Sequence, residues 1–518
     1  MSDRTEDPIN LDELSLGDIL DGALRDRPVS VLGFARSGIA LTRFLTDAGA
    51  RVTVYDARPA DELTDAIRGL DGRTVRLLLG PGVEPADALA GASLVATSPS
   101  ISPDFPTTEP RLRSALRELV NAREAGDRDT PALVSEADLF LRLCPSPTIG
   151  VTGTKGKTTT ASLAAAVLGA DPRHPVVLGG NIGRPLIERL PELTLGHRVV
   201  IELSELQLPT LSRGTTVAVY TNVTADHLDR HGTLEAYRRV KGRLADLVPA
   251  GGALVLNADD PVVSSYAATS RVVRYRDGAP GPGEVGVVAG WITSDGVEQL
   301  ALAGQTGPAA SGPILPLDEL TVPGRHNVAN AMAAVAAGLL FGVEPSAIRP
   351  AAAAFAGVEH RLEVVTTIDR VRFVNDSQGT QPDAVVAALR AFEPPLVLIA
   401  GGRDKGVDLG DLPDVVADRA SAAVVIGETA QALEERFRSS GLRLVERART
   451  IEEAVDKADE LARQALGSSP KGTIATVVLS PAAASFDMFA DYEERGRAFK
   501  AAVSALASEA ASTEEGSR

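Results

Sequence analysis

One glycine-rich stretch carries the residue types best suited to chemistry, Gly150-Val-Thr-Gly153-Thr-Lys-Gly156-Lys157-Thr158-Thr159. An apolar run of strand length precedes it and a helical pattern follows it. In such a turn, backbone N–H groups and the helix N-terminus converge on an anion. The lysine can reach the outer phosphates of a nucleotide, and the first threonine of the helix can offer its hydroxyl to Mg²⁺. The stretch predicts ATP binding by Gly153, Thr154, Lys155, Gly156, Lys157, Thr158 and Thr159. The alternative is a glycine turn with an incidental lysine.

A second glycine turn, Gly33-Phe-Ala-Arg36-Ser37-Gly38, lies near the N-terminus between an apolar run and a helical pattern. Asp56 ends the next predicted strand, at the position where a nicotinamide enzyme binds ribose. The third glycine of the dinucleotide pattern is not at its usual spacing. A nicotinamide-dependent oxidoreductase with an added nucleotide domain therefore remains open.

The elements around these turns predict an α/β protein. Apolar runs of strand length alternate with helical patterns in three blocks, which indicates mainly parallel sheets covered on both faces. We expect a flexible acidic extension at residues 1–27 and domains at 28–135, 136–359 and 360–518, the last with a mobile tail. The Gly- and Pro-rich residues 277–316 predict loops and hairpins at the edge of the second block.

Composition excludes several classes of protein. The formal net charge of −17 argues against nucleic acid as a partner. The sequence has no long apolar run and no signal-peptide pattern, so we expect no membrane partner. Cys144 is the single cysteine, which fits a reducing compartment. These features predict a cytoplasmic protein.

Several segments together resemble one enzyme superfamily, the Mur ligases and folylpolyglutamate synthases. The resemblance spans residues 29–499 and keeps family order and spacing. It rests on the spelling T-G-T-K-G-K-T-T and on Gly179-Gly-Asn181-Ile-Gly183, Glu202-Leu-Ser204, Asn222-Val-Thr-Ala-Asp226-His227-Leu-Asp229-Arg230, Gly324-Arg-His326-Asn327-Val-Ala-Asn330-Ala331 and His360-Arg361-Leu-Glu363. Folylpolyglutamate synthases lack a first domain like residues 29–134, which favours the Mur ligases.

The resemblance implies a fold, a reaction and a metal site. The fold would comprise a Rossmann-like N-terminal domain, a central P-loop ATPase-like domain and a C-terminal Rossmann-like domain. The reaction would join a carboxylate to an amine through an acyl phosphate, with ATP as co-substrate. Two Mg²⁺ ions would be held by Thr158, Glu202, His227 and Lys241. The implied catalytic residues are Lys157, Glu202, His227 and Lys241, and further ATP contacts are Asn327, Asn330, Arg361 and Asp376.

Lys241 has two interpretations. It lies in the helical stretch Tyr237-Arg-Arg-Val-Lys241, where an ordinary lysine would be solvated. The resemblance implies that it reacts with CO₂ and becomes a carbamate. That reaction requires a neutral primary amine, which arginine cannot supply, and the product is an anion able to bind Mg²⁺.

Within the family, the chain resembles the ligases that add D-glutamate to UDP-N-acetylmuramoyl-L-alanine. The implied UDP-sugar contacts are Ser37, Gly38, Asp56, Arg58, Ser98, Asn181, Ser204 and Gln207. The implied amino-acid contacts are Thr380, Lys405, Ser485 and Tyr492. Four positions depart from the family: Ser100 replaces glycine, Gln378 replaces lysine, Tyr492 replaces phenylalanine and Glu205 replaces a small residue.

The expected partners are small molecules alone, namely UDP-N-acetylmuramoyl-L-alanine, D-glutamate and ATP, and the expected state is a monomer. One alternative is a Mur-type ligase for another amino acid. A nicotinamide-dependent oxidoreductase would leave Lys241, Asn327 and Arg361 without roles. The third alternative, an inactive nucleotide sensor, conflicts with the intact catalytic set.

Overall fold

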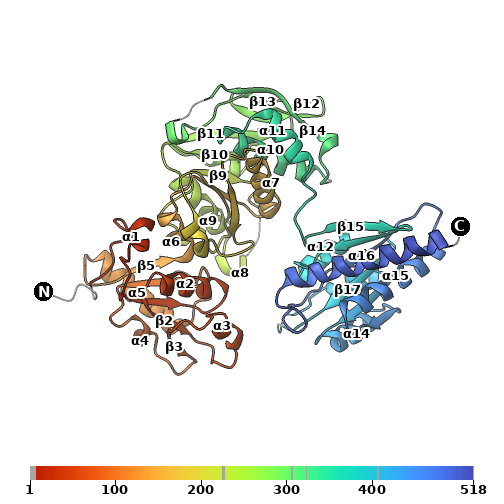
Figure 1. Cartoon of the computed structure of the whole chain (residues 1–518), viewed down its shortest axis with the longest axis horizontal. Helices are drawn as coiled ribbons and strands as arrows, with labels where there is room; N and C mark the ends of the chain where they lie inside the picture. The colour runs from red at the N-terminus through yellow and green to blue at the C-terminus, as the bar shows by residue number, and fades with distance from the viewer. Residues whose placement is uncertain are drawn as a thin grey trace. The chain divides into compact units, whose positions relative to one another are not determined.

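The computed structural model describes residues 7–224, 228–304, 307–322, 324–404, 406 and 408–516 (Figure 1). The chain divides after Phe355 into two compact units. Within the described residues, the strands form sheets of five, nine and six strands, the first two in the N-terminal unit and the third in the C-terminal unit. The α/β class and the mainly parallel sheets predicted from the sequence are confirmed.

The first sheet consists of β1 (Pro28–Leu32), β2 (Arg51–Asp56), β3 (Arg76–Leu79), β4 (Leu94–Thr97) and β5 (Ala132–Ser135). Their order is β3-β2-β1-β4-β5, and every pair is parallel. The connecting helices are α2 (Arg36–Asp47), α3 (Thr64–Arg68), α4 (Pro85–Leu89) and α5 (Pro110–Glu124). The strand order reverses between β1 and β4, which is where open parallel sheets bind ligands.

The residues before β1 were expected to be flexible, and for residues 7–27 this expectation is wrong. Apolar side chains spaced along this segment are buried in the core, namely Ile9, Leu11, Leu16, Ile19 and Leu24. Helix α1 (Leu16–Leu20) begins with a capping box in which Ser15 and Asp18 bond to each other's backbone. Asp12 also pairs with Arg142 at 2.8 Å. The acidic composition suggested a flexible segment, but the spaced apolar residues make it amphipathic and pack it against the N-terminal unit.

The second sheet has the order β14-β13-β12-β11-β10-β9-β6-β8-β7. Its parallel strands are β6 (Thr148–Thr152), β7 (Val176–Gly180), β8 (Arg198–Glu202), β9 (Val217–Tyr220), β10 (Ala253–Asn257), β11 (Arg271–Arg276) and β12 (Glu284–Val288). Strands β13 (Trp291–Val297) and β14 (Ala310–Pro316) are antiparallel and lie at one edge, as the Gly- and Pro-rich sequence predicts.

The helices of this region are α6 (Glu136–Leu143), α7 (Lys157–Gly169), α8 (Leu228–His231), α9 (Leu234–Leu247), α10 (Arg325–Leu340) and α11 (Pro345–Ala353), with short 3₁₀ helices η1 (Leu186–Glu192), η2 (Leu208–Thr210), η3 (Val263–Ser265), η4 (Leu302–Gly304) and η5 (Leu317–Glu319). Helices α7 and α10 lie side by side (Figure 1). Alanines of α10 permit this close packing, and a side chain at Gly338 would collide with Val167.

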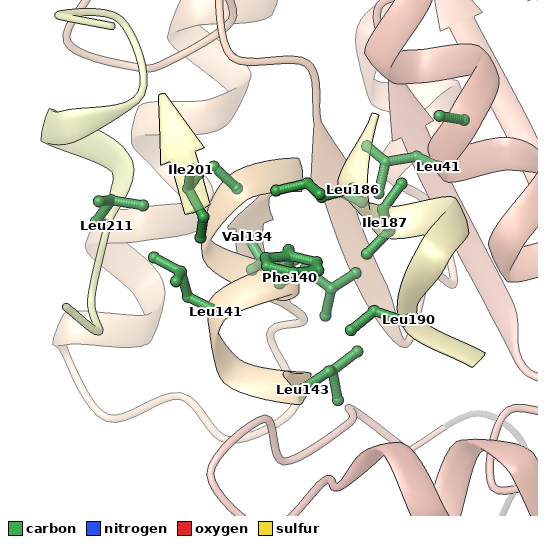
Figure 2. Close-up of a cluster of buried hydrophobic side chains, with 14 of the residues drawn as sticks. Leu41, Val134, Phe140, Leu141, Leu143, Leu186, Ile187, Leu190, Ile201 and Leu211 are labelled. Atoms are coloured by element: carbon green, nitrogen blue, oxygen red, sulfur yellow. The ribbon is translucent and has the colours of Figure 1, made fainter. Parts of the chain in front are cut away.

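One hydrophobic core joins the first and second sheets. Figure 2 shows its centre, where α6 packs against η1 and α2. The buried side chains there are Leu41, Phe140, Leu141, Leu143, Leu186, Ile187 and Leu190. Since burying one such side chain stabilises the fold by roughly 1.5–3 kcal/mol, this core holds both sheets in one unit.

The C-terminal unit contains the third sheet. Its order is β15-β16-β20-β17-β18-β19, formed by β15 (Glu363–Ile368), β16 (Val371–Asn375), β17 (Leu396–Gly401), β18 (Ala422–Ile426), β19 (Val445–Arg447) and β20 (Ala475–Leu479). Only β15 and β16 are antiparallel neighbours among these described strands. The helices are α12 (Pro382–Ala391), α13 (Leu412–Arg419), α14 (Ala430–Ser439), α15 (Ile451–Gly467) and α16 (Tyr492–Gly516). Residues 508–516, part of the segment that was expected to be a mobile tail, belong to α16. Among the described helices, none has the length and apolar character needed to cross a membrane.

The packing of the N-terminal segment can be tested with two leucines. Leu24 is 1% exposed and Leu20 is 60% exposed. We predict that Leu24→Ala lowers the free energy of unfolding by about 2–5 kcal/mol, because it leaves a cavity in the shared core. Leu20→Ala should change it by less than about 0.5 kcal/mol. Urea denaturation measures both, and equal effects of the two substitutions would contradict the packed segment.

Candidate functional site

Several predicted site residues of the N-terminal unit lie in the loop after β6 and in the loops after its two neighbouring strands. β6 lies between β8 and β9, and both pairs are parallel. Because the carboxyl ends of parallel strands meet at one edge, the loops at 153–156, 203–207 and 221–224 are neighbours. These loops contain the glycine-rich turn, the residues after Glu202 and the start of the His227 segment.

The glycine-rich turn is held open by the loop after β9. Gly153 and Gly156 have φ angles of 145° and 82°, which only glycine adopts readily. The Thr154 N–H donates to the Asn222 carbonyl at 2.7 Å, and the Lys155 N–H donates to the Asn222 side chain at 2.9 Å. Lys157 Nζ donates to the Thr154 carbonyl at 2.9 Å, so its charge lies at the turn. The turn is therefore shaped before any ligand arrives.

The start of α10 lies against this turn. A Cβ on Gly156 would approach Asn330 Oδ1 to 2.6 Å, so the backbone of the turn rests against that side chain. Thr160 Oγ1 donates to the same oxygen at 3.0 Å, and Asn330 in turn donates to Asn327 at 3.0 Å. Asn330 thus meets the first turns of α7, although 170 positions separate it from Thr160 in the chain, and Asn327 is linked to α7 through Asn330.

Glu202 ends β8 and is 2% exposed. Its Oε1 accepts a hydrogen bond from Asn181 Nδ2 at 2.9 Å. Its Oε2 is buried and has no hydrogen-bond donor among the described residues. An unsatisfied buried charge of this kind costs about 1–3 kcal/mol or more, which a bound cation would offset. The carboxylate therefore fits a metal ligand.

The described residues contain no group of three His, Cys, Asp or Glu side chains arranged for a metal ion. Among the described residues, an ion beside Glu202 could therefore take hydroxyl oxygens as ligands, together with water and phosphate oxygens. That ligand set is typical of Mg²⁺, which keeps several waters and binds through one or two carboxylates and substrate phosphates. The buried Thr158, at the start of α7, supplies a hydroxyl.

Lys241 is 0% exposed, so the solvated-lysine interpretation is wrong. Its Nζ lies 3.4 Å from Thr152 Oγ1 and 5.6 Å from the centre of the Tyr237 ring. The Tyr237 hydroxyl is 3.1 Å from Thr154 Oγ1 in the glycine-rich turn. The amine therefore lies against the end of β6, and burying it as a cation costs free energy.

The first sheet presents a second cluster at the carboxyl ends of β1, β2 and β4. A Cβ on Gly38 would collide with the Gly33 carbonyl, so only glycine permits this tight turn. Asp56 accepts hydrogen bonds from the Phe34 N–H and from Arg58 at 2.8 Å. Burial raises the pKa of Asp56, but the hydrogen bonds from Arg58 and Phe34 outweigh burial, and the net shift is downward.

Ser37 and Ser98 complete this cluster. Ser37 lies in the first turn of α2, and Ser98 donates to the Gly33 carbonyl at 3.2 Å. Ser204 and Gln207 lie instead beside Glu202, where the Gln207 side chain accepts bonds from the Ser204 N–H at 2.9 Å and its hydroxyl at 3.0 Å. Arg36 donates to the Gly183 carbonyl at 3.4 Å, which links the first turn to the loop that holds Asn181.

In the C-terminal unit, Asp376 lies at the end of β16 and is 5% exposed. It accepts hydrogen bonds from Ser480 Oγ at 2.7 Å and from the Leu362 N–H at 3.1 Å. Burial nevertheless raises the pKa of Asp376 to about 6. Arg361 contributes a smaller opposing effect on that pKa. Asp376 and Arg361 are therefore electrostatic neighbours.

Three predicted amino-acid contacts lie near this region of the same unit. Thr380 follows Asp376 in the same loop. Ser485 is buried, and Tyr492 begins α16 and accepts a hydrogen bond from Ser377 at its carbonyl, at 2.7 Å. His227 and Lys405 lie outside the described residues.

Sequence reasoning missed two buried charges. Arg495 is 1% exposed and donates to the carbonyls of Ser377, Ala483 and Ala484 at 3.0–3.3 Å, so it ties the loop of Asp376 to the loop of Ser485. Burial lowers its pKa to about 10. Glu136, in the first turn of α6, has a pKa raised to about 7 by burial. No local pattern distinguishes either residue from a surface charge on an amphipathic helix.

Comparisons with known proteins identify the family of the chain. The Mur ligase middle domain matches residues 151–338, and the glutamate ligase domain of Mur ligases matches residues 360–482. UDP-N-acetylmuramoylalanine–D-glutamate ligase of Symbiobacterium thermophilum is 40% identical and covers 92% of this chain and 98% of its own length. The chain belongs to the Mur ligase family.

A second Mur ligase, UDP-N-acetylmuramoylalanine–D-glutamate ligase of Pelotomaculum thermopropionicum, is 37% identical over 93% of this chain and 98% of its own length. Among solved structures, UDP-N-acetylmuramate–alanine ligase of Thermotoga maritima aligns with 92% of this chain and 99% of its own, at 17% identity and a TM-score of 0.49. As a Mur ligase, the protein is an ATP-dependent ligase with ATP as co-substrate. The alternative of a nicotinamide-dependent oxidoreductase is therefore wrong.

The raised pKa of Asp376 predicts a pH dependence of stability. Its ordinary pKa is 3.8 and its folded pKa is about 6. Between these values only the folded state keeps the proton, so the free energy of unfolding falls as the pH rises and is constant above the window. Between pH 3.8 and about 6, the free energy of unfolding of the wild type should fall by about 3 kcal/mol relative to that of Asp376→Asn. Urea denaturation of both proteins measures this, and a difference independent of pH would contradict it.

Proposed function

We propose that this Mur ligase joins the L-alanyl carboxylate of UDP-N-acetylmuramoyl-L-alanine to the amine of D-glutamate, releasing ADP and phosphate. The observation that carries the proposal is the near full-length similarity to ligases named for this reaction, at 40% and 37% identity. The buried Glu202 oxygen beside the glycine-rich turn supports it independently. The product would be a precursor of peptidoglycan.

The chemistry proceeds in two steps. A carboxylate oxygen attacks the γ-phosphorus of ATP, the bond to the β-phosphate oxygen breaks, and ADP leaves an acyl phosphate behind. The amine nitrogen then attacks the acyl carbon, loses a proton, and expels phosphate that retains the original carboxylate oxygen. In this chain, the amides of residues 153–158 and the Lys157 ammonium would hold the phosphates during the first step. Gly153, Thr154, Lys155, Gly156, Thr158 and Thr159 form the cradle.

Two Mg²⁺ ions complete the proposed site and would supply charge neutralisation for phosphoryl transfer. Thr158 and Glu202 are assigned to one ion, and His227 and the carbamate of Lys241 to the other. The buried, unpaired Glu202 oxygen fits the first assignment. The complete burial of Lys241 fits the second, because a neutral amine is needed to capture CO₂. The resulting anion would bind a cation where an ammonium cannot.

The UDP-sugar is assigned to two clusters of the N-terminal unit. The domain at 28–135 would bind the diphosphate and uracil through Ser37, Gly38, Asp56, Arg58 and Ser98. The domain at 136–359 would bind the muramoyl part through Asn181, Ser204 and Gln207, beside Glu202. The hydrogen bond from Arg36 to Gly183 connects the two clusters, which supports a single elongated substrate.

The domain at 360–518 is assigned the amino acid through Thr380, Lys405, Ser485 and Tyr492, and the ATP ribose through Asp376 with Arg361. Asn327 and Asn330 are assigned the adenine. The Oε1 atom of Gln378 is buried and has no donor among the described residues, whereas the family lysine would bring a donor. A different amino acid is therefore the alternative worth testing. We further propose a cytoplasmic monomer.

Phosphate release from ATP tests the substrates. We expect release only when UDP-N-acetylmuramoyl-L-alanine and D-glutamate are both present, with L-glutamate and other amino acids inactive. Omitting either substrate is the control. If release needs the UDP-sugar but is faster with another amino acid, that amino acid would take the place of D-glutamate in the proposal. Release with no UDP-sugar, or with no pair at all, would contradict the assigned reaction.

Lys241→Arg tests the carbamate. Arginine keeps the positive charge but cannot capture CO₂, so we expect phosphate release to fall by roughly 100-fold or more, about 3 kcal/mol in the barrier. With isotope-labelled bicarbonate, the carbamate carbon should give an NMR signal in the wild type and none in the variant. Lys457→Arg, on α15, is the matched control and should retain both properties. An unchanged signal in Lys241→Arg would contradict the assignment.

A further inference from the structure

A tyrosine hydroxyl contacts the backbone of the helix that carries Lys241. Tyr220, the last residue of β9, is 0% exposed. Its hydroxyl donates to the Lys241 carbonyl of α9 at 2.8 Å and accepts from the Ala245 N–H at 2.9 Å. In a regular α-helix, each N–H donates to the carbonyl four residues earlier, which here pairs Ala245 with Lys241. The hydroxyl therefore contacts both backbone groups of one helical turn, and that turn begins at Lys241.

The other end of the same lysine meets the neighbouring strand. Lys241 Nζ lies 3.4 Å from Thr152 Oγ1, at the end of β6. Thr152 and Tyr220 are partners in the register of β6 and β9. Since partners on adjacent strands lie side by side, the sheet presents both side chains to α9 at one place. Tyr220 contacts the backbone of Lys241, and Thr152 contacts its amine.

The tyrosine is itself fixed by its surroundings. Burial raises the pKa of Tyr220 well above its usual value, so the hydroxyl keeps its proton and can donate. Its ring lies 5.0 Å from the Tyr266 ring, and the Tyr266 hydroxyl donates to the Arg238 carbonyl of α9 at 3.0 Å. The Tyr275 hydroxyl donates to the Tyr220 carbonyl at 2.9 Å. The Tyr220 hydroxyl is consequently a fixed point beneath α9.

A fixed polar contact matters here because apolar packing has no direction. Hydrophobic burial alone allows a helix to slide or rotate slightly, whereas hydrogen bonds have preferred distances and angles. The buried face of α9 consists of Tyr237, Lys241, Leu244 and Ala245. Two hydrogen bonds to one oxygen restrict the backbone of this face at the lysine. The place of that backbone decides whether the amine reaches the end of β6.

We infer that Tyr220 is a positioning residue for Lys241: its hydroxyl fixes the backbone of α9 so that the lysine amine reaches the carboxyl end of β6. The inference rests on the proposed function for the carbamate of Lys241. A misplacement of about 1 Å in a reacting group can lower a rate by about 100-fold. Tyr220 should therefore affect carbamate formation and kcat, with the KM values for the UDP-sugar and D-glutamate unchanged.

Tyr220→Phe tests this inference because it removes the hydroxyl and keeps the ring. The Lys241 carbonyl and the Ala245 N–H can still bond to each other, so we expect the variant to fold, with a slightly lower midpoint of urea denaturation. With isotope-labelled bicarbonate, half of the maximal carbamate signal should require about 10-fold more bicarbonate, and kcat for phosphate release should fall by about 10-fold. Added bicarbonate should partly restore kcat.

A second readout follows the lysine itself and needs no carbamate. In protein with isotope-labelled lysine Cε, the NMR signal of Lys241 can be assigned because Lys241→Arg lacks it. In bicarbonate-free buffer, we expect Tyr220→Phe to move this signal, because the amine shifts relative to the Tyr237 ring, whose centre lies 5.6 Å from Nζ in the wild type. The signal of Lys457, on α15, should stay in place.

Tyr266→Phe is the matched control. It also removes a tyrosine hydroxyl that donates to a carbonyl of α9, at 3.0 Å, but that carbonyl belongs to Arg238. The Tyr220 hydroxyl keeps its two contacts with the turn of Lys241 in this variant. We expect the Lys241 signal, the bicarbonate dependence and kcat to match those of the wild type.

Two outcomes would overturn the inference. One is a folded Tyr220→Phe variant in which the Lys241 signal and the bicarbonate dependence equal those of the wild type, because the hydroxyl would then only stabilise the fold. The other is an equal change in Tyr266→Phe, because the loss of any bond to α9 would then move the lysine. If the wild type forms no carbamate and releases no phosphate, the proposed function fails, while the Lys241 signal in bicarbonate-free buffer still decides the role of Tyr220.

Discussion

The placement of β6 between two parallel neighbours is the constraint on which the site depends. Its pairing with β8 and β9 sets the glycine-rich turn beside the end of β8, where Glu202 lies, and beside the end of β9, where Asn222 lies. Asn222 then shapes the turn through its carbonyl and its side chain. A different strand order would leave the same residues at separate places on the sheet edge. The strand order therefore brings these residues together, and their side chains then determine which chemistry is possible.

The structure also requires that some backbone segments approach one another closely. Gly38 lies against the Gly33 carbonyl, Gly156 against Asn330, and Gly338 against Val167, so each glycine removes a side chain where two elements touch. The hydrophobic core around α6 then fixes the first sheet relative to the second, as Figure 2 shows. The cluster around Asp56 and the glycine-rich turn consequently belong to one compact unit.

Local patterns predicted the parts of the molecule whose geometry is local. The fold class followed from strand and helix alternation, and the glycine-rich turn between β6 and α7 followed from its own sequence. Residues 7–27 were mispredicted because their acidic composition outweighed a few spaced apolar residues. The burial of Lys241 and the contacts of Arg495 depend on segments that are distant in the chain. Such contacts produce no periodic pattern in a single sequence.

The central claim is that ATP activates a carboxylate of the UDP-sugar at this site. The most direct measurement uses UDP-N-acetylmuramoyl-L-alanine with heavy oxygen in the L-alanyl carboxylate, ATP, D-glutamate and the enzyme, with mass analysis of the released phosphate. The account predicts that each phosphate carries one heavy oxygen, because the carboxylate oxygen leaves with the acyl phosphate. Phosphate without the label would show that ATP is cleaved by water, which would contradict the account.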